Sequence, residues 1–407
     1  MNLLFAWRYF KAKKSTNAIN IIAWVSVIAI MLITAAFIIL LSVFNGFEGL
    51  VKSLYSSFYT DLKISPREGK SIIVTKEQLH KLRGLKNISA FSLEVEEKTL
   101  LQNGEIQTIV YLKGVDSNFT KITSVAGKLI RGKFELGNGD KASIVLGSGI
   151  ENALGVQSDR SLYPITAYLF KRGVNINVVD PYEAFSAENI STTGTFFIQQ
   201  DIDNKYAITN TDFMKKMLSM KPDEYGSIEL GVNDSRKLAD TKKELAKIFP
   251  GNYLIETRFE QNKSLYSVMT LEKWVMYGLL TLMLIVAAFT MIGALTMLVL
   301  EKQKDIQILK ALGADNKRIR TIFLSEGVLL ASMGSFGGVL LAIFIAWAQV
   351  RYKLVGIEGG TFLIDYYPVD LRLSDFILVL ITVMIIAVIA SWFPAKNAAR
   401  QPVELKS

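Results

Sequence analysis

The sequence predicts an α-helical membrane protein with four transmembrane helices and an α+β domain inserted between helices 1 and 2. Three observations lead to this fold class. Half of the 407 residues are hydrophobic and the mean hydropathy is +0.30, which is untypical of a soluble two-domain protein. The apolar residues gather in four blocks that are nearly free of charge, and a long polar stretch, residues 45–273, separates the first two blocks.

The four apolar blocks are residues 19–44, 274–300, 322–350 and 376–393, and Glu326 is the single charged residue within them. About 20 apolar residues are needed to cross about 30 Å of hydrocarbon, and the last block reaches this length with its flanks. Buried core helices are the alternative, which runs this long and this poor in charge disfavour. A signal peptide has an apolar region of about 7–15 residues, so the first block is interpreted as an uncleaved membrane helix.

The distribution of charge predicts the orientation of the helices. The formal charge is +9, and residues 1–18, 301–321 and 394–407 carry +4, +3 and +2 of it. The polar stretch 45–273 carries +2, residues 351–375 carry −1, and Glu326 carries −1. Basic residues in short loops mark the cytoplasmic side. We therefore expect a cytoplasmic N-terminal segment 1–18, a cytoplasmic loop 301–321 and a cytoplasmic tail 394–407, with the domain 45–273 and the loop 351–375 outside. No basic face is left over for nucleic acid.

The outside domain shows mixed α and β patterns. Residues 45–60 and 257–273 keep helical spacing, which predicts that membrane helices 1 and 2 continue outward as stalks. Between them, short β-like runs alternate with helical stretches, which is typical of an α+β domain. Residues 171–193 show no clean periodicity, and their apolar members leave open a contact loop or a merely flexible one.

Several kinds of bond chemistry are excluded. The chain has no cysteine and only one histidine, His80, so disulfides, thiolate zinc sites and multi-histidine metal sites are ruled out. Residues 127–134 match most of a phosphate-binding loop, but Phe134 stands where that motif requires Ser or Thr for Mg²⁺. We therefore expect no catalytic residues, no metal and no cofactor in this chain, and any energy source must be a partner.

The loop 301–321 contains a short amphipathic helix. Ile306, Ile308, Leu309 and Leu312 form its apolar side, and Gly313 ends it. Such a helix either lies in the lipid headgroups or docks into a groove of a cytoplasmic protein, and the residues alone do not decide between these roles.

Several motifs resemble those of one permease superfamily. Residues 301–314, EKQKDIQILKALGA, resemble the coupling helix of MacB/FtsX-like ABC permeases, and residues 393–404, FPAKNAARQPVE, resemble their C-terminal signature. Residues 41–48, LSVFNGFE, and 365–369, DYYPV, resemble the LolC/LolE branch. Shorter segments at 8–10, 111–116, 144–147 and 194–196 agree, so the resemblance spans nearly the whole chain.

The resemblance implies a MacB-like periplasmic core for the domain and a multi-pass inner-membrane location. It also implies a lipoprotein-releasing permease subunit without catalytic activity, which lifts triacylated lipoproteins from the outer leaflet of the inner membrane. The implied partners are a LolD-like ATPase dimer that binds ATP and Mg²⁺, a second permease subunit (the same chain or a paralogue), a LolA-like chaperone and membrane lipid. The residues expected to couple to the ATPase are Glu301, Lys302, Asp305, Ile306, Leu309, Lys310, Leu312 and Gly313. The residues expected in the chaperone-binding hook are Val178, Val179, Tyr182 and Phe185.

Acyl chains that leave a bilayer need an apolar surface, because each exposed CH₂ group costs about 0.8 kcal/mol in water. Two apolar faces near the outer ends of the first and second helices are the candidates. Ordinary lipid-facing or packing residues are the alternative for each position, with Trp274 as an interfacial anchor. The candidate acyl-contact residues are Ala36, Leu40, Phe44, Phe47, Trp274, Met276 and Leu280.

Two features of the third helix have structural interpretations. Gly334 and Gly338 form a GxxxG pair suited to close packing within the chain, and Glu326 is expected to have a shallow, anchoring role near Arg318 or Arg320. Two other functions remain as alternatives. A MacB-like exporter usually carries an N-terminal ATPase, for which 18 residues are too few, and an FtsX-like regulator of a periplasmic hydrolase usually has a smaller outside domain.

Overall fold

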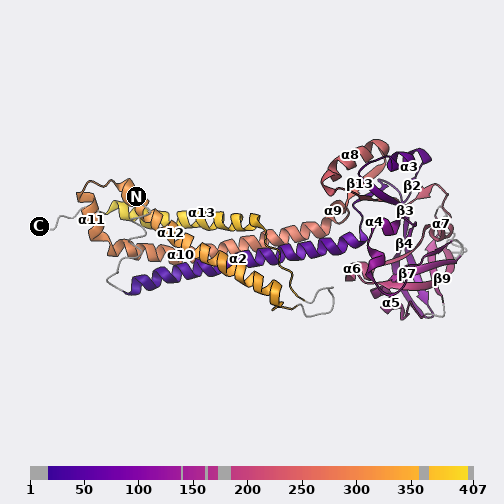
Figure 1. Ribbon diagram of the computed structural model, residues 1–407, viewed down its shortest axis with the longest axis horizontal. Coiled ribbons are helices and arrows are strands. Elements are labelled where there is room, and N and C mark those ends of the chain that lie inside the picture. The colour runs from indigo at the N-terminus through magenta and orange to yellow at the C-terminus, as the bar shows by residue number, and fades with distance from the viewer. Residues whose placement is uncertain (1–16, 139–140, 161–163, 173–184, 357–365, 402–407) are drawn as a thin grey trace, which may run out of the picture. The chain divides into compact units, whose positions relative to one another are not determined.

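The computed structural model describes residues 17–138, 141–160, 164–172, 185–356 and 366–401 (Figure 1). These residues form two compact units. The helical unit contains the chain up to Leu50 and most of the chain from Ser267 onward, and the α/β unit contains Val51–Tyr266. Each unit has its own hydrophobic core.

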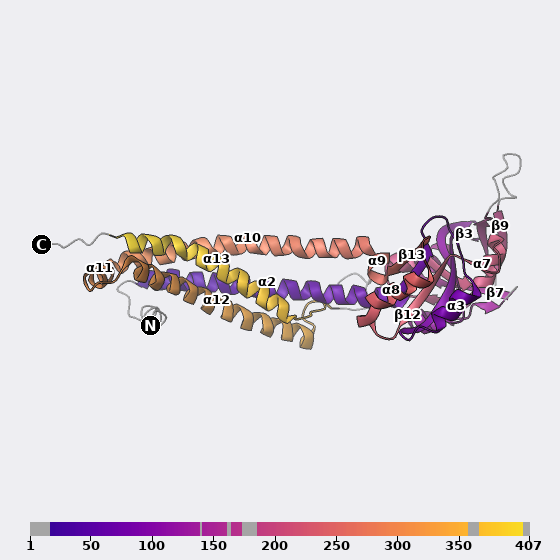
Figure 2. The same ribbon diagram turned by 90° about the horizontal axis from the view of Figure 1, so that it is seen from above.

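Four long helices make up the helical unit. They are α2 (Asn17–Phe58), α10 (Lys263–Glu301), α12 (Asn316–Tyr352) and α13 (Leu373–Arg400). All four are long and apolar enough to cross a membrane. Both ribbon views show them side by side within the unit (Figures 1 and 2). The four apolar blocks of the sequence therefore lie within four helices, as predicted.

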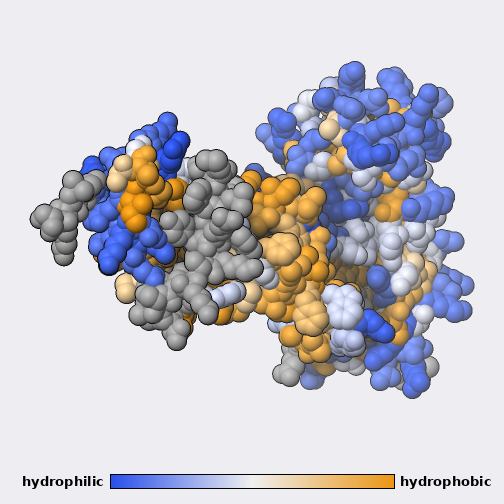
Figure 3. All heavy atoms as spheres, turned by 60° about the vertical axis from the view of Figure 1, so that its left-hand side comes forward, coloured by the Kyte–Doolittle hydropathy of each residue, from blue (hydrophilic) through white to orange (hydrophobic). Residues whose placement is uncertain are grey.

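The helical core is one cluster of buried apolar side chains drawn from all four helices, among them Phe37, Met291, Ala342 and Val383. Many other apolar side chains of the same helices point outward, and Figure 3 shows hydrophobic residues along the middle of the helical unit and mostly hydrophilic ones over the α/β unit. This pattern fits helices that pack on one another and face hydrocarbon on the other side.

Small residues let α12 approach α2 closely. A Cβ added at Gly338 would lie 2.6 Å from the carbonyl oxygen of Met31, and one at Gly334 would lie 2.9 Å from the Cβ of Ile30. The GxxxG pair thus packs inside this chain, as the sequence analysis predicted.

The predicted stalk extensions are only partly continuous. Helix α2 runs unbroken to Phe58, so the extension after the first membrane block is confirmed. The extension before the second block is not one helix, because a short helix α9 (Arg258–Gln261) precedes α10. The break lies at Asn262, whose φ of −119° and ψ of 33° are not helical, and α9 itself begins at a capping box in which Thr257 and Glu260 bond each other's backbone.

The α/β unit is built on strands whose pairing closes on itself. Strands β3, β4, β10, β7, β9 and β8 pair in that order, and β8 pairs again with β3. The long strand β3 also pairs with β12, which leads to β1 and β13. The described strands are β1 (Leu62–Pro66), β2 (Ile72–Ile73), β3 (Ile88–Asn103), β4 (Ile106–Val115), β5 (Leu129–Gly132), β6 (Gly137–Asn138), β7 (Lys141–Gly147), β8 (Ile165–Phe170), β9 (Phe185–Phe196), β10 (Tyr206–Asn210), β11 (Glu224–Tyr225), β12 (Ser227–Val232) and β13 (Tyr253–Thr257).

Short helices cover the sheet and supply its two apolar cores. Met214 and Leu218 pack with Leu112 and Leu146 in one core, and Leu245 packs with Leu62 in the other. The helices are α3 (Lys76–Arg83), α4 (Phe119–Ile122), α5 (Ser148–Leu154), α6 (Gln200–Asp203), α7 (Thr211–Leu218) and α8 (Leu238–Ile248), with 3₁₀ turns at Val125–Lys128 and Ser235–Lys237.

Two sequence interpretations are settled here. Residues 171–193 show no clean periodicity in the sequence, but the part from Phe185 onward belongs to β9, Phe185–Phe196, which pairs antiparallel with β8 and parallel with β7. The segment that resembles a phosphate-binding loop contains the edge strand β5 instead of a loop that opens a helix, which agrees with its rejection as a nucleotide site.

Candidate functional site

The predicted coupling segment is a short helix between two sharp turns. Helix α10 ends at Glu301, α11 (Gln303–Ala311) follows, and Gly313 adopts φ +89°. Asp315 then caps α12, because its Oδ1 accepts a hydrogen bond from the backbone N–H of Arg318 at 2.9 Å. Glycine at the left-handed position and aspartate at the cap explain why the chain turns here.

Helix α11 presents apolar side chains on two faces instead of one. Ile306 is 2% exposed and packs into the helical core, and the partly buried Leu309 lines a small cavity beside it. Ile308 and Leu312, by contrast, are 59% and 80% exposed. The predicted apolar side is therefore divided into an inner pair that anchors α11 and an outer pair that is open.

Polar contacts fix α11 to its neighbours. The ammonium group of Lys310 donates to the carbonyl oxygens of Ala399 at 2.9 Å and Gln401 at 2.6 Å, at the end of α13. Lys302 forms an ion pair with Asp305 at 3.2 Å. The helix is thus tied to α10, α12 and α13 by its inner face, which leaves the outer pair as its open apolar surface.

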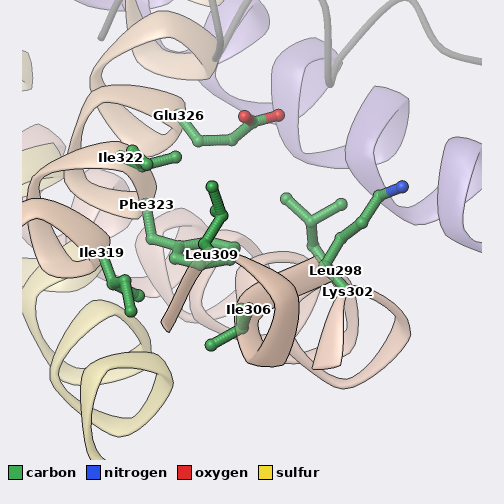
Figure 4. A pocket seen from close by; sticks show the side chains of 8 residues that line it. All are labelled: Leu298, Lys302, Ile306, Leu309, Ile319, Ile322, Phe323 and Glu326. Atoms are coloured by element: carbon green, nitrogen blue, oxygen red, sulfur yellow. The ribbon is translucent and has the colours of Figure 1, made fainter. Parts of the chain in front are cut away.

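The small cavity lies among α10, α11 and α12. Figure 4 shows Leu298, Ile306 and Leu309 facing side chains of α12 across it. Glu326 is at its edge and is only 2% exposed. Its side chain is therefore buried by the helices around the predicted coupling segment, and the expected shallow, anchoring role near Arg318 or Arg320 stays a prediction.

The candidate acyl-contact residues differ in exposure. On α2, Ala36 is exposed and Leu40, Phe44 and Phe47 are partly buried. On α10, Trp274 is 61% exposed, Met276 is partly buried and Leu280 is 5% exposed. Leu280 packs in the helical core, so it offers no open surface in this structure. An acyl-contact role stays a prediction for the whole set.

Only one candidate hook residue lies in the described part of the chain. Phe185 begins β9, and its ring centroid is 4.1 Å from that of Phe170 on the paired strand β8. The other three, Val178, Val179 and Tyr182, lie outside the described residues.

A buried group of charged side chains in the α/β unit escaped the sequence analysis. Lys113 of β4 forms ion pairs with Glu94 of β3 at 2.9 Å and with Glu229 of β12 at 2.8 Å, and all three are at most 1% exposed. Lys63 lies 3.6 Å from Glu229. In the sequence these residues look like ordinary charged strand positions, and only the strand order brings them together.

The carboxyl groups of this cluster differ in pKa. Burial and the neighbouring Glu229 raise the pKa of Glu94 well above its ordinary value. Burial also opposes the ionisation of Glu229, but the ammonium groups of Lys113 and Lys63 outweigh it and lower its pKa to about 2. The cluster therefore favours a protonated Glu94 beside an ionised Glu229.

A second polar group, in the helical unit, was also missed. Asn45 of α2 is fully buried, and its side-chain amide bonds Asp375 of α13 and Lys273 of α10. The available signals were the residues 44–48, FNGFE, and an aspartate beside the apolar run of α13.

Comparison with known proteins identifies the class. Residues 277–403 match the FtsX-like permease C-terminal family. This range includes most of α10, the predicted coupling segment, α12 and α13, so this part of the chain is similar to FtsX-like permeases.

Two curated relatives align with nearly the whole chain. The chain is 26% identical to the lipoprotein-releasing system transmembrane protein LolE of Haemophilus influenzae, over 99% of this chain and 98% of the relative. It is 27% identical to the lipoprotein-releasing system transmembrane protein LolC of Neisseria meningitidis serogroup B, over 98% of each. These similarities support a LolC/LolE-like permease.

A solved structure was also compared. The periplasmic region of MacB from Actinobacillus actinomycetemcomitans covers 54% of this chain and 98% of its own length, at 11% identity and a TM-score of 0.36. That TM-score is too low to establish a shared fold.

Proposed function

We propose that this chain is the permease subunit of an ATP-driven ABC transporter that extracts lipoproteins from the outer leaflet of the inner membrane. It passes them to a periplasmic LolA-like chaperone. The observation that carries the proposal is the similarity to LolC and LolE proteins over nearly the whole chain. The fold supports it with four membrane-length helices and a large α/β unit.

Helix α11 is the coupling helix, which receives the movement of the ATPase. An exposed apolar pair, Ile308 and Leu312, on the outer face of a short helix suits a groove on a cytoplasmic ATPase, of the kind that receives amphipathic helices. Because Ile306 and Lys310 fix the inner face of α11 to the helical unit, movement of α11 is transmitted to α13 and the helices beside it. ATP and Mg²⁺ are bound by that ATPase, a LolD-like dimer.

The charge distribution supports the orientation. The basic segments 1–18, 301–321 and 394–407 mark the cytoplasmic side. Both termini and α11 are then cytoplasmic, and the α/β unit is periplasmic. This orientation brings the ATPase to α11 and the chaperone to the α/β unit.

The lipoprotein is held through its acyl chains. Trp274 and Ala36 are exposed on α10 and α2, and the partly buried Phe44 and Phe47 continue the apolar surface of α2. A second permease subunit, either the same chain or a paralogue, completes the binding cavity. A surface of this kind offsets the cost of about 0.8 kcal/mol for each acyl CH₂ group that leaves the bilayer.

Depletion of the protein in its own cells tests the function. We expect lipoproteins destined for the outer membrane to accumulate in the inner membrane within a few generations, as measured by separating the two membranes on a density gradient. Re-expression of the wild-type chain restores sorting. Correct sorting after full depletion would show that the proposed function is wrong.

Reconstitution tests the mechanism. Vesicles that contain the permease, its ATPase and a triacylated lipoprotein are expected to release the lipoprotein to a soluble LolA-like chaperone only when ATP is hydrolysed. Release of the lipoprotein without ATP, or no release with ATP, contradicts the proposal. The purified complex also shows whether one or two kinds of permease chain are present.

A further inference from the structure

Residues 366–375, here called the clasp, follow α2 closely at Ser42–Glu48. The backbone N–H of Asp370 donates to the carbonyl oxygen of Ser42 at 3.0 Å. The side-chain amide of Asn45 donates to the carbonyl oxygen of Asp370 at 3.3 Å. Residues separated by more than 320 positions in the sequence are thus joined through the backbone.

The contact is close enough to require glycine. A Cβ added at Gly46 would collide with the carbonyl oxygen of Pro368. Next to it, the ring of Phe47 packs edge-on against Tyr367 with centroids 5.6 Å apart. Within residues 44–48, FNGFE, contacts with the clasp therefore explain the residue types at Asn45, Gly46 and Phe47.

A polar group centred on the buried Asn45 joins α2 to both α13 and α10. The amide nitrogen of Asn45 donates to the carboxylate of Asp375 on α13, and the amide oxygen accepts from Lys273 on α10 at 2.8 Å. Lys273 also lies 3.8 Å from Asp375. Asparagine is suited to this place because it donates to an anion and accepts from a cation at once.

A surface ion pair completes the clasp. The guanidinium group of Arg372 donates to Glu48 at 3.2 Å and to Asp370 at 2.9 Å. The clasp thus bonds α2 on both sides of Gly46.

We propose that the clasp holds α2, α10 and α13 together at this end in the lipoprotein-free state, and that it opens to admit the acyl chains of the lipoprotein. Asn45 and Asp375 are the positioning residues. This inference rests on the proposed function. Phe44 and Phe47 flank Asn45 on α2, and Lys273 precedes Trp274 on α10, so the Lys273–Asn45 bond bridges the two helices where the acyl chains are expected.

The chemistry of the clasp suits opening and closing. The two cations at the clasp are partly exposed, Lys273 by 31% and Arg372 by 38%, and ion pairs of partly exposed side chains contribute little net stability. When the clasp opens, the long and already partly exposed side chains of Lys273 and Arg372 can reach water or lipid headgroups, so neither cation is left without solvation.

Crosslinking measures the opening directly. The chain has no cysteine, so Glu48→Cys with Arg372→Cys gives it a single cysteine pair, and the full permease is then reconstituted with its ATPase in lipid vesicles. A bismaleimide reagent is expected to crosslink the pair about tenfold faster without nucleotide than during ATP hydrolysis with a triacylated lipoprotein present. The crosslinked complex should no longer release lipoprotein. Equal crosslinking rates in both conditions, or normal release by the crosslinked complex, would overturn the proposal.

Two glycine variants distinguish an effect on the opening of the clasp from an effect on the general stability of the protein. Gly46→Ala displaces the clasp, whereas the matched change Gly49→Ala, one turn further along the same helix, meets no atom within 4 Å. Because an easier opening removes part of the conformational cost of binding, Gly46→Ala should lower the half-saturating lipoprotein concentration about threefold or more. Gly49→Ala should leave it unchanged. If both variants match the wild type, or if Gly46→Ala raises this concentration, the clasp does not control access.

The two proposals fail in different ways. If the wild-type complex releases no lipoprotein at all, the proposed function is wrong. The dependence of the crosslinking rate on ATP hydrolysis still decides whether the clasp opens.

Discussion

The ammonium group of Lys113 lies 2.8 Å from a carboxylate oxygen of Glu229, and both side chains are at most 2% exposed. Phe58, the last residue of α2, lies beside this pair, with its ring centroid 5.0 Å from the same ammonium group. The pair therefore joins β4 to β12 next to the point where the long helix ends and the sheet begins. The contribution of this ion pair to the stability of the α/β unit can be tested, because one partner can be replaced while the other remains.

Removal of the Lys113 cation should destabilise the α/β unit strongly. Lys113→Met leaves the ionised Glu229 buried with only Lys63 nearby, and the loss of one partner from a buried ion pair costs about 3–5 kcal/mol. Thermal unfolding of the full chain in detergent, followed by near-ultraviolet circular dichroism, measures the change. The exposed Lys86 is the control position, and Lys86→Met should unfold as the wild type does. Equal stability of the two variants would contradict the buried-pair interpretation.

Asp203 should make the stability of the same unit depend on pH. It is 1% exposed, its carboxylate oxygens accept from the backbone N–H of Ile198 at 3.0 and 3.2 Å, and burial raises its pKa to about 6. Between about pH 4 and pH 6 the folded chain keeps a proton that the unfolded chain has lost. The free energy of unfolding therefore falls as the pH rises through this window, by up to about 3 kcal/mol, and stays at the lower value above it.

Two asparagine variants test this pH dependence. Asp203→Asn cannot ionise, so relative to the wild type it should gain stability between pH 4 and pH 7. The exposed neighbour Asp201 provides the matched change, and Asp201→Asn should keep the wild-type pH profile. Urea unfolding at a series of pH values gives both profiles, and a wild-type slope in Asp203→Asn would rule out this carboxyl as the cause.

The sequence predicted the parts of the fold that depend on local composition. The four membrane-length helices follow from charge-free runs, and the turn after α11 follows from Gly313. The buried charges could not be predicted in the same way. Glu94, Lys113 and Glu229 lie on three strands, and their burial depends on the strand order β12–β3–β4, which no local pattern encodes.

The candidate site likewise has features that the sequence predicts and features that only the packing shows. The candidate coupling segment was proposed from its resemblance, but its two apolar faces were not predicted, because Ile306 and Ile308 differ only in which neighbours surround them. The clasp was missed since Asn45 and Asp375 are 330 positions apart. Residue type indicated a polar side chain at each end, and only the packing of α2 against α13 shows that they bond.

Close packing of α12 on α2 gives a further prediction. In Gly338→Ala the new methyl group would lie 2.6 Å from the carbonyl oxygen of Met31, a backbone atom that cannot move aside alone. Overpacking of this kind costs about 1–3 kcal/mol, so the melting temperature of the helical unit in detergent should fall. Gly293→Ala on α10 is the control, because its methyl group meets no atom within 4 Å. A melting temperature for Gly338→Ala at or above that of the control would contradict the close contact.

The outer face of α11 should decide ATPase binding, whereas the inner face should decide folding. Ile308→Ser with Leu312→Ser removes two exposed apolar side chains, so it should leave the melting temperature unchanged. It should weaken ATPase binding by about a hundredfold or more, since aliphatic side chains buried in an interface each contribute about 1.5–3 kcal/mol. Ile306→Ala should instead cost about 2–5 kcal/mol of stability, because it opens a cavity in the helical core. Co-purification with the ATPase and thermal unfolding separate the two effects. Leu354, 68% exposed and just beyond the other end of α12, provides the control, and Leu354→Ser should bind the ATPase normally. If the outer pair can be replaced without loss of binding, α11 meets the ATPase through its polar side chains, and the amphipathic division described here has no role in coupling.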